Sequence, residues 1–163
     1  MTFTRRLARP MLASVFVTAG IDVLRNPGPR AKIAAPVAAA ASSALPIPDD
    51  PELLVKVNAG VQIGAGLLLA AGRFPRLAAL ALAGSLIPTT AAGHRFWEEE
   101  DPSRRAQQQI HFMKNLAILG GLILAAVDTE GAPSLTWRAK QAIESTTAVT
   151  ADALSRGVDL LTP

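Results

Sequence analysis

The stretch QIHFMKNLAILGGLILAAV, residues 109–127, decides how the rest of the chain is interpreted. Its apolar run begins at Ile110 and carries no charge from Leu116 until Asp128. A helix of about 18 residues is roughly 27 Å long at 1.5 Å per residue, close to the thickness of a hydrocarbon core. We therefore predict that this stretch is a membrane-spanning helix.

The first turns of this helix carry three polar side chains, those of His111, Lys114 and Asn115. Offsets of three and four residues place them on one face of a helix. A lysine inside a membrane span is costly unless it has a partner or a wet cavity. We therefore expect Lys114 to be buried against a partner or a ligand instead of reaching the lipid headgroups.

The composition also favours a membrane protein, since 50% of the 163 residues are hydrophobic and only 18% are charged. Cysteine is absent, which excludes disulfides, thiolate catalysis, iron–sulfur ligation and cysteine-type zinc sites. The basic residues are scattered at the ends of apolar runs and form no dense block. They indicate membrane topology and no nucleic-acid partner.

Three further apolar segments predict spans, and they cover Leu7–Leu24, Leu53–Gly72 and Leu77–Gly93. The first lacks a clear cleavage site and is interpreted as an uncleaved span. Within the second, Gly60-x-x-x-Gly64 would permit close helix approach. The prediction is an all-α fold, a four-transmembrane-helix bundle over residues 1–128, followed by a tail over residues 129–163.

The segments between and after the spans are interpreted separately. Residues 25–51 form an alanine- and proline-rich loop, whose apolar stretch Ile33–Leu45 is too short to span. That stretch is either a re-entrant or interfacial piece or an alanine-rich helix lying over the bundle. Asp50 is a candidate N-cap for the second span, and residues 94–108 form a charged loop with Trp97 at headgroup level. Residues 133–161 predict an amphipathic helix that lies on the membrane or packs against protein.

An even number of spans puts both termini on one side of the membrane. A small excess of lysine and arginine flanks the spans on that side, which predicts cytoplasmic termini. Antiparallel threading brings the ends of spans one and three to the same face as the starts of spans two and four. Most of the polarity within the spans lies there, in Asp22, Lys56, Asn58, Gln62, Thr89, Thr90, His94, Arg95, His111, Lys114 and Asn115. This asymmetry predicts a polar pocket open to one interface.

Asp22 is the only acidic residue inside the predicted spans, and Lys56 and Lys114 compete for it. We expect one lysine to pair with Asp22. The other would be free to bind an anion or a carbonyl oxygen, such as a carboxylate or the head of a quinone. The alternative is that the lysines reach the headgroups and the cluster is only a network at the helix ends.

The sequence shows no arrangement typical of catalysis. His94 and His111 would allow metal or haem ligation, but no His-x-x-x-His or acidic partner supports it, so we expect no metal and disfavour haem. Phosphate-binding loops, nucleophile elbows and paired carboxylates are also missing. We therefore expect a protein that is not itself an enzyme.

Three motifs resemble the DoxX family. They are Ala19-Gly20-Ile21, the glycine-containing span before Arg73–Arg76, and HFMKNL at 111–116 followed by Gly120-Gly121. The resemblance covers about residues 5–127. Gln62 departs from the family, where this position is often acidic, and the tail lies outside the shared region.

The resemblance implies a four-helix protein of the bacterial plasma membrane. The family takes its name from a subunit of a thiosulfate:quinone oxidoreductase. A mycobacterial member that resembles this chain is linked to a membrane complex with a sulfurtransferase and a superoxide dismutase. The implied function is a membrane anchor or quinone-contacting subunit of a redox complex. This function is compatible with a homo-oligomer. The alternative function is a binder or carrier of a small amphiphile.

Overall fold

The structure is a computed structural model that describes residues 3–44 and 46–129 and, in the tail, residues 137, 140, 141, 143, 144 and 147. Contacts divide the chain into two units, Met1–Asp128 and Thr129–Pro163. The described residues of the first unit form five α-helices and one short 3-10 helix, η1 (Phe96–Glu98), and contain no strand. The all-α prediction is confirmed.

Four helices are long and apolar enough to cross a membrane. They are α1 (Phe3–Arg25), α3 (Pro51–Ala70), α4 (Pro75–Gly93) and α5 (Pro102–Val127). Large apolar side chains stay exposed along them, as Leu124 at 71% and Leu77 at 67% illustrate. Such a surface suits lipid rather than water. The chain is therefore a multi-pass membrane protein with four spans, as predicted.

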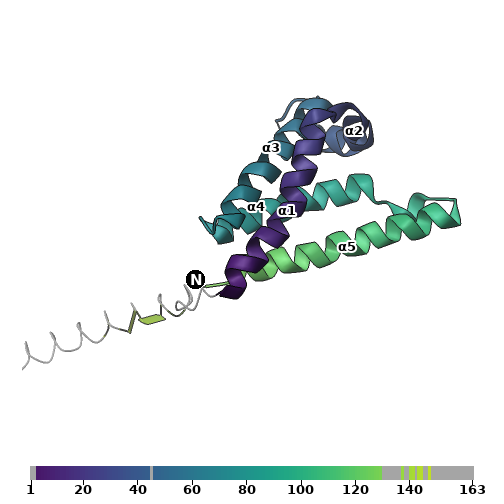
Figure 1. The fold of residues 1–163 in the computed structure, drawn as a ribbon. Helices are drawn as coiled ribbons and strands as arrows, with labels where there is room; N and C mark the ends of the chain where they lie inside the picture. Colours follow the sequence, from purple (N-terminus) through teal and green to yellow (C-terminus); the bar gives the residue numbers. More distant parts are fainter. Residues whose placement is uncertain are drawn as a thin grey trace, which may run out of the picture. The chain divides into compact units, whose positions relative to one another are not determined.

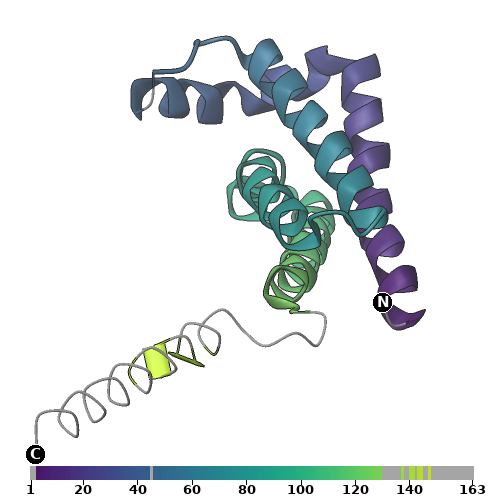
Figure 2. The same ribbon diagram turned by 90° about the vertical axis from the view of Figure 1, so that its left-hand side faces the viewer.

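The spans pack in the order α1 on α3, α3 on α4 and α4 on α5. α1 and α5 meet only near the start of α1 and the end of α5, and they diverge from there (Figure 1). Figure 2 views α4 and α5 nearly end-on, while α1 and α3 run across the view. The bundle thus consists of two helix pairs, α1 with α3 and α4 with α5, which cross each other.

Glycine permits the close approach of α1 and α3. A Cβ atom on Gly20 would lie 2.7 Å from Ile63 Cγ1 and 2.9 Å from the Ala59 carbonyl oxygen. A Cβ atom on Gly66 would lie 2.8 Å from Val17 Cγ2. Gly60 and Gly64, which the sequence suggested for this role, have open space around them. The expectation about which glycines form the contact was therefore wrong.

Most of the segment expected to be a loop after the first span is a helix, α2 (Pro27–Ala44). Alanine is the best helix former, and a proline in the first turn costs no hydrogen bond. Only Asn26 separates α2 from α1. α2 packs on α3 and α4, and Figure 2 shows it crossing α3. Of the two interpretations of Ile33–Leu45, the structure has the alanine-rich helix lying against the bundle.

Two Asp-Pro pairs begin helices. The Asp50 carboxylate accepts hydrogen bonds from the backbone N–H groups of Glu52 and Leu53 and caps α3, as expected. Asp101 caps α5 in the same way. α5 therefore begins at Pro102 and takes in residues that the sequence analysis assigned to a charged loop. The amphipathic helix expected over 133–161 lies outside the described residues, apart from the six tail positions given above.

Candidate functional site

Side-chain amides join α4 to α3 and to α5. Asn58 on α3 donates from Nδ2 to the Thr89 hydroxyl at 3.3 Å. Asn115 on α5 donates from Nδ2 to the Thr90 hydroxyl at 3.0 Å. Because Thr89 and Thr90 are consecutive, they project in different directions around α4 and serve different partners. The predicted polar residues at the end of the third span therefore join three helices.

A second amide contact lies deeper between α3 and α4. Gln62, which is 5% exposed, donates from Nε2 to the Ser85 hydroxyl at 3.0 Å. The Thr89 hydroxyl in turn donates to the Ser85 carbonyl oxygen at 2.8 Å. Ser85 was not among the expected site residues. Its position four residues before Thr89, on the same helix face, is the signal that could have found it.

The two histidines form a stacked pair between the C-terminal end of α4 and the N-terminal part of α5. Their ring centroids are 5.2 Å apart and the rings are inclined by 25°. His94 Nδ1 lies 2.7 Å from Gln108 Oε1, and His111 Nδ1 lies 3.4 Å from Lys114 Nζ. His94, His111 and Lys114 are therefore brought together, as the sequence predicted, and Gln108 joins them.

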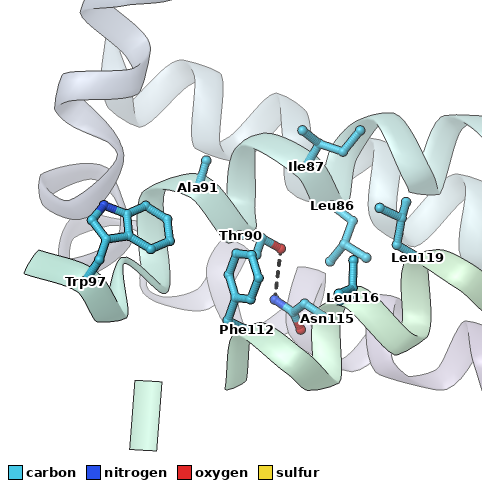
Figure 3. A pocket seen from close by; sticks show the side chains of 9 residues that line it. All are labelled: Leu86, Ile87, Thr90, Ala91, Trp97, Phe112, Asn115, Leu116 and Leu119. Carbon is cyan, nitrogen blue, oxygen red and sulfur yellow. Dashed lines mark hydrogen bonds between the residues drawn. The ribbon is translucent and has the colours of Figure 1, made fainter. Parts of the chain in front are cut away.

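An apolar groove of about 220 Å³ runs between α4 and α5 (Figure 3). Its lining comes from α4, η1 and α5 and consists of Leu86, Ile87, Thr90, Ala91, Trp97, Phe112, Asn115, Leu116 and Leu119. The hydrogen bond between Asn115 and Thr90 lies amid these apolar side chains (Figure 3). Of the predicted site residues, only Thr90 and Asn115 line this groove.

Aromatic rings gather at one end of the groove. Phe96, Trp97 and Phe112 pack edge to face, with centroids 5.2 to 6.0 Å apart. Such arrangements are favourable beyond the area they bury. Among the described residues there is no group of three or more His, Asp or Glu side chains that could hold a metal. The groove therefore presents apolar walls, aromatic rings and one amide with its threonine partner.

Asp22 and Lys56 take no part in this arrangement. The Asp22 carboxylate pairs with Arg30 on α2 at 3.4 Å, and Lys56 pairs with Glu52, one turn earlier on α3, at 2.6 Å. In the described part of the chain, Lys114 has no carboxylate within 4.0 Å. The expected pairing of Asp22 with a lysine was therefore wrong. Lys114 is exposed, so its expected burial was wrong as well. The expected single pocket is divided into separate contacts.

Charged residues between α4 and α5 are engaged within their own loop. Arg95 donates to the Ala91 carbonyl oxygen at 2.7 Å and pairs with Glu98 at 3.3 Å. A hydrogen bond from the Ser103 hydroxyl, followed by one from the Arg104 backbone N–H, holds the pKa of the Asp101 carboxyl below its usual value. Arg95 thus closes the end of α4 and does not reach the groove lining.

A charged cluster at the opposite end of the spans was not expected from the sequence. Arg5 forms a two-point pair with Asp128, and Arg9 Nη2 lies 3.5 Å from the same carboxylate. Nearby, Arg76 donates to the Ala126 carbonyl oxygen at 2.8 Å, near the end of α5. We call Arg5, Arg9 and Asp128 the terminal clasp. Its signal was the position of these charges at the start of the first span and the end of the last, which threading places on one face.

Comparison with known proteins identifies the family. A search of curated proteins and a search of solved structures each found no match. The sequence model of the DoxX family matches residues 5–95, which is more than half of the chain. The match covers α1 to α4 and stops before α5, so it is shorter than the resemblance over 5–127 had implied. On this match, and with the four membrane-spanning helices that accompany it, the chain belongs to the DoxX family.

Proposed function

We propose that this protein is a membrane subunit that holds the ring of a lipid-soluble quinone in the groove between α4 and α5. The observation that carries the proposal is Asn115. Its side chain is only 9% exposed, yet it lies in the lining of an otherwise apolar groove. A buried polar group among apolar side chains is retained at a cost unless it serves a structural or recognition role.

The chemistry of the amide suits both redox forms of such a ring. Asn115 uses one N–H for Thr90. An asparagine side chain has a second N–H and a carbonyl oxygen with two lone pairs. The N–H can donate to a quinone carbonyl, and the oxygen can accept from a quinol hydroxyl. One residue can therefore bind the oxidised and the reduced ligand without a change in its own charge.

The size and walls of the groove point to a ring rather than to a whole ligand. Its volume of about 220 Å³ is below the roughly 300–1,000 Å³ of pockets that enclose drug-sized molecules. Trp97 and Phe112 place aromatic rings in the lining, against which a flat ring can pack. Leu116 and Ile87, both more than half exposed, would guide an isoprenoid tail into the surrounding lipid.

Tryptophan fluorescence tests the proposal directly. The chain has two tryptophans, so a Trp137→Phe background leaves Trp97 in the groove lining as the reporter. We expect a short-chain benzoquinone or naphthoquinone to quench Trp97 saturably in detergent. Asn115→Leu should weaken binding about tenfold, because a hydrogen bond in an apolar site is lost. Quenching that rises linearly with quinone and never saturates would contradict the proposal.

The chain supplies a matched control for this variant. Asn58→Leu is the same substitution on the other side of α4, where the lost hydrogen bond goes to Thr89 instead of Thr90. Both variants lose one amide contact between helices. Only Asn115 lines the groove. Equal loss of quinone binding in the two variants would indicate general loosening of the bundle.

The family resemblance supports a wider role for the same subunit, which is to anchor soluble redox enzymes such as a sulfurtransferase and a superoxide dismutase at the plasma membrane. A pull-down in mild detergent with mass spectrometry of proteins and small molecules tests this. Soluble redox enzymes would support the anchor. A stoichiometric lipid-like molecule with no redox chemistry would favour the alternative, a carrier of a small amphiphile.

A further inference from the structure

A basic cluster next to the groove has a different chemistry from the groove itself. His94 ends α4, and His111 and Lys114 lie one turn apart on α5. We call these three residues the His-His-Lys cluster. None of them lines the groove. Its two histidines lie one turn closer to the loop than the Thr90–Asn115 hydrogen bond, because His94 follows Thr90 by four residues and His111 precedes Asn115 by four.

The hydrogen bonds of the cluster leave donor capacity free. An ammonium group donates and never accepts, so the 3.4 Å contact between Lys114 Nζ and His111 Nδ1 makes that nitrogen the acceptor. The proton of the neutral His111 ring is then on Nε2. Gln108 Oε1 likewise fixes the proton of His94 on Nδ1. Lys114 keeps two N–H donors and His111 keeps one.

Among the described residues, Lys114 forms no ion pair. The acid in the adjoining loop that forms an ion pair, Glu98, is engaged by Arg95. Asp101 is used as the N-cap of α5. Lys114 itself is exposed. In the described part of the chain no carboxylate lies within 4.0 Å of its ammonium group, whereas Lys56 at the start of α3 has Glu52 at 2.6 Å.

The position along α5 places the cluster at the level of the lipid headgroups. α5 has 26 residues, so it is about 39 Å long and exceeds a hydrocarbon core of about 30 Å. Its first turns, with Arg104, Arg105 and Gln107–Gln109, are polar and belong outside the core. Lys114 then lies about 6 Å below Ile110, within the reach of a lysine side chain that extends toward the interface.

We propose that the His-His-Lys cluster binds the phosphate of an anionic phospholipid such as phosphatidylglycerol. Lys114 supplies the charge, and His111 supplies a neutral N–H donor beside it. The acyl chains would lie deeper along α5, past Ala117, which is exposed, and Gly120, which has no described side chain within 4 Å of its Cβ position. Exposed surface at this depth faces lipid, so a lipid is the occupant that is already present at high concentration.

Native mass spectrometry tests the proposal. The full chain is released from nanodiscs that contain equal amounts of phosphatidylglycerol and phosphatidylcholine, and the ratio of the two lipids that it retains is measured. We expect the wild type to retain phosphatidylglycerol preferentially. Lys114→Gln should lower the retained ratio of the two lipids about fivefold, the effect of one lysine near an anionic membrane surface, and Lys114→Arg should preserve most of it. Lys56→Gln is the matched control and should leave the ratio unchanged.

Several results would overturn the assignment. The same ratio in Lys114→Gln as in the wild type would show that Lys114 does not select the lipid. Equal loss in Lys56→Gln would show a general charge effect. Displacement of the lipid by millimolar inorganic phosphate would identify a site for free phosphate, and a change in oligomeric state without a change in the ratio would identify a protein contact. Asn115→Leu should keep the lipid ratio while losing quinone, so this proposal and the proposed function fail separately.

Discussion

The Asp128 carboxylate accepts two hydrogen bonds from the Arg5 guanidinium, one from Nε at 2.7 Å and one from Nη2 at 2.9 Å. The two residues are 123 positions apart and join the first turn of α1 to the residue that follows α5. The two side chains are 27% and 25% exposed. A bidentate arginine–carboxylate pair with this shielding is stronger than an ordinary surface ion pair.

The terminal clasp therefore predicts an unequal response to loss of a carboxylate. Asp128→Asn leaves Arg5 and Arg9 close together without their shared acid, and we expect the free energy of unfolding to fall by about 1.5–3 kcal/mol. Asp22→Asn is the control, since its pair with Arg30 is mostly exposed and should contribute no more than about 1 kcal/mol. Thermal unfolding in detergent compares the two. Similar losses would mean that the terminal clasp is no stronger than a surface pair.

Glycine substitutions should separate packed from open helix faces. Gly20→Ala places a methyl group 2.9 Å from the Ala59 carbonyl oxygen, a backbone atom that cannot move aside alone. We expect a loss of about 1–3 kcal/mol from this overpacking. Gly64→Ala meets nothing within 4 Å and should be neutral or stabilise by up to about 1 kcal/mol, because alanine favours helix. A destabilised Gly64→Ala variant would reveal that this face packs against another chain.

Acid should weaken the start of α5. The pKa of Asp101 is lowered in the folded protein, chiefly by the Ser103 hydroxyl. A carboxyl with a lowered pKa contributes stability that is present above its unfolded pKa, about 3.9, and is lost as the pH falls through the folded value. Asp101→Asn can still cap the helix but does not titrate. We expect its unfolding temperature to depend less on pH below about 4 than that of the wild type.

Reporter fusions should show both termini in the cytoplasm. Fusions at Gly28 and Pro102 are expected to report the outside, and fusions at Phe74 and the C-terminus the inside, because more lysine and arginine flank the spans on the terminal side. Phe74 lies in the turn between α3 and α4 and Pro102 opens α5. The same compartment for Phe74 and Pro102 would contradict four spans. Inversion at all four sites would contradict only the orientation.

The spans could be predicted from the sequence because length and apolar character alone define a helix that crosses a membrane. The helix starts were harder. Asp50-Pro51 was recognised as a start, but the same signal at Asp101-Pro102 was overlooked because charged residues follow it. α2 was taken for a loop because Pro36 lies within it, although its alanines stabilise the helix around that position.

The candidate site could be predicted only where neighbouring spans determine it. Threading alone brings the end of α4 to the start of α5, so Thr90 and His94 were expected near Asn115 and His111. The specific contacts that these residues make were not predicted. Asp22 was assigned the wrong partner because Arg30 lies on a helix that had not been expected. The groove depends on where the side chains of Trp97 and Phe112 lie relative to α4. No spacing in the sequence specifies these positions.

The terminal clasp also bears on how the protein is made. It joins the helix that leaves the ribosome first to the residue that follows the helix leaving last. Spans enter the bilayer before they associate. The ion pairs of Arg5 and Arg9 with Asp128 can therefore form only after Asp128 has been synthesised. The pair of α1 and α3 can dock earlier through Gly20 and Gly66. The order of synthesis therefore allows the contact of α1 with α3 to form before the one that joins α1 to the end of α5.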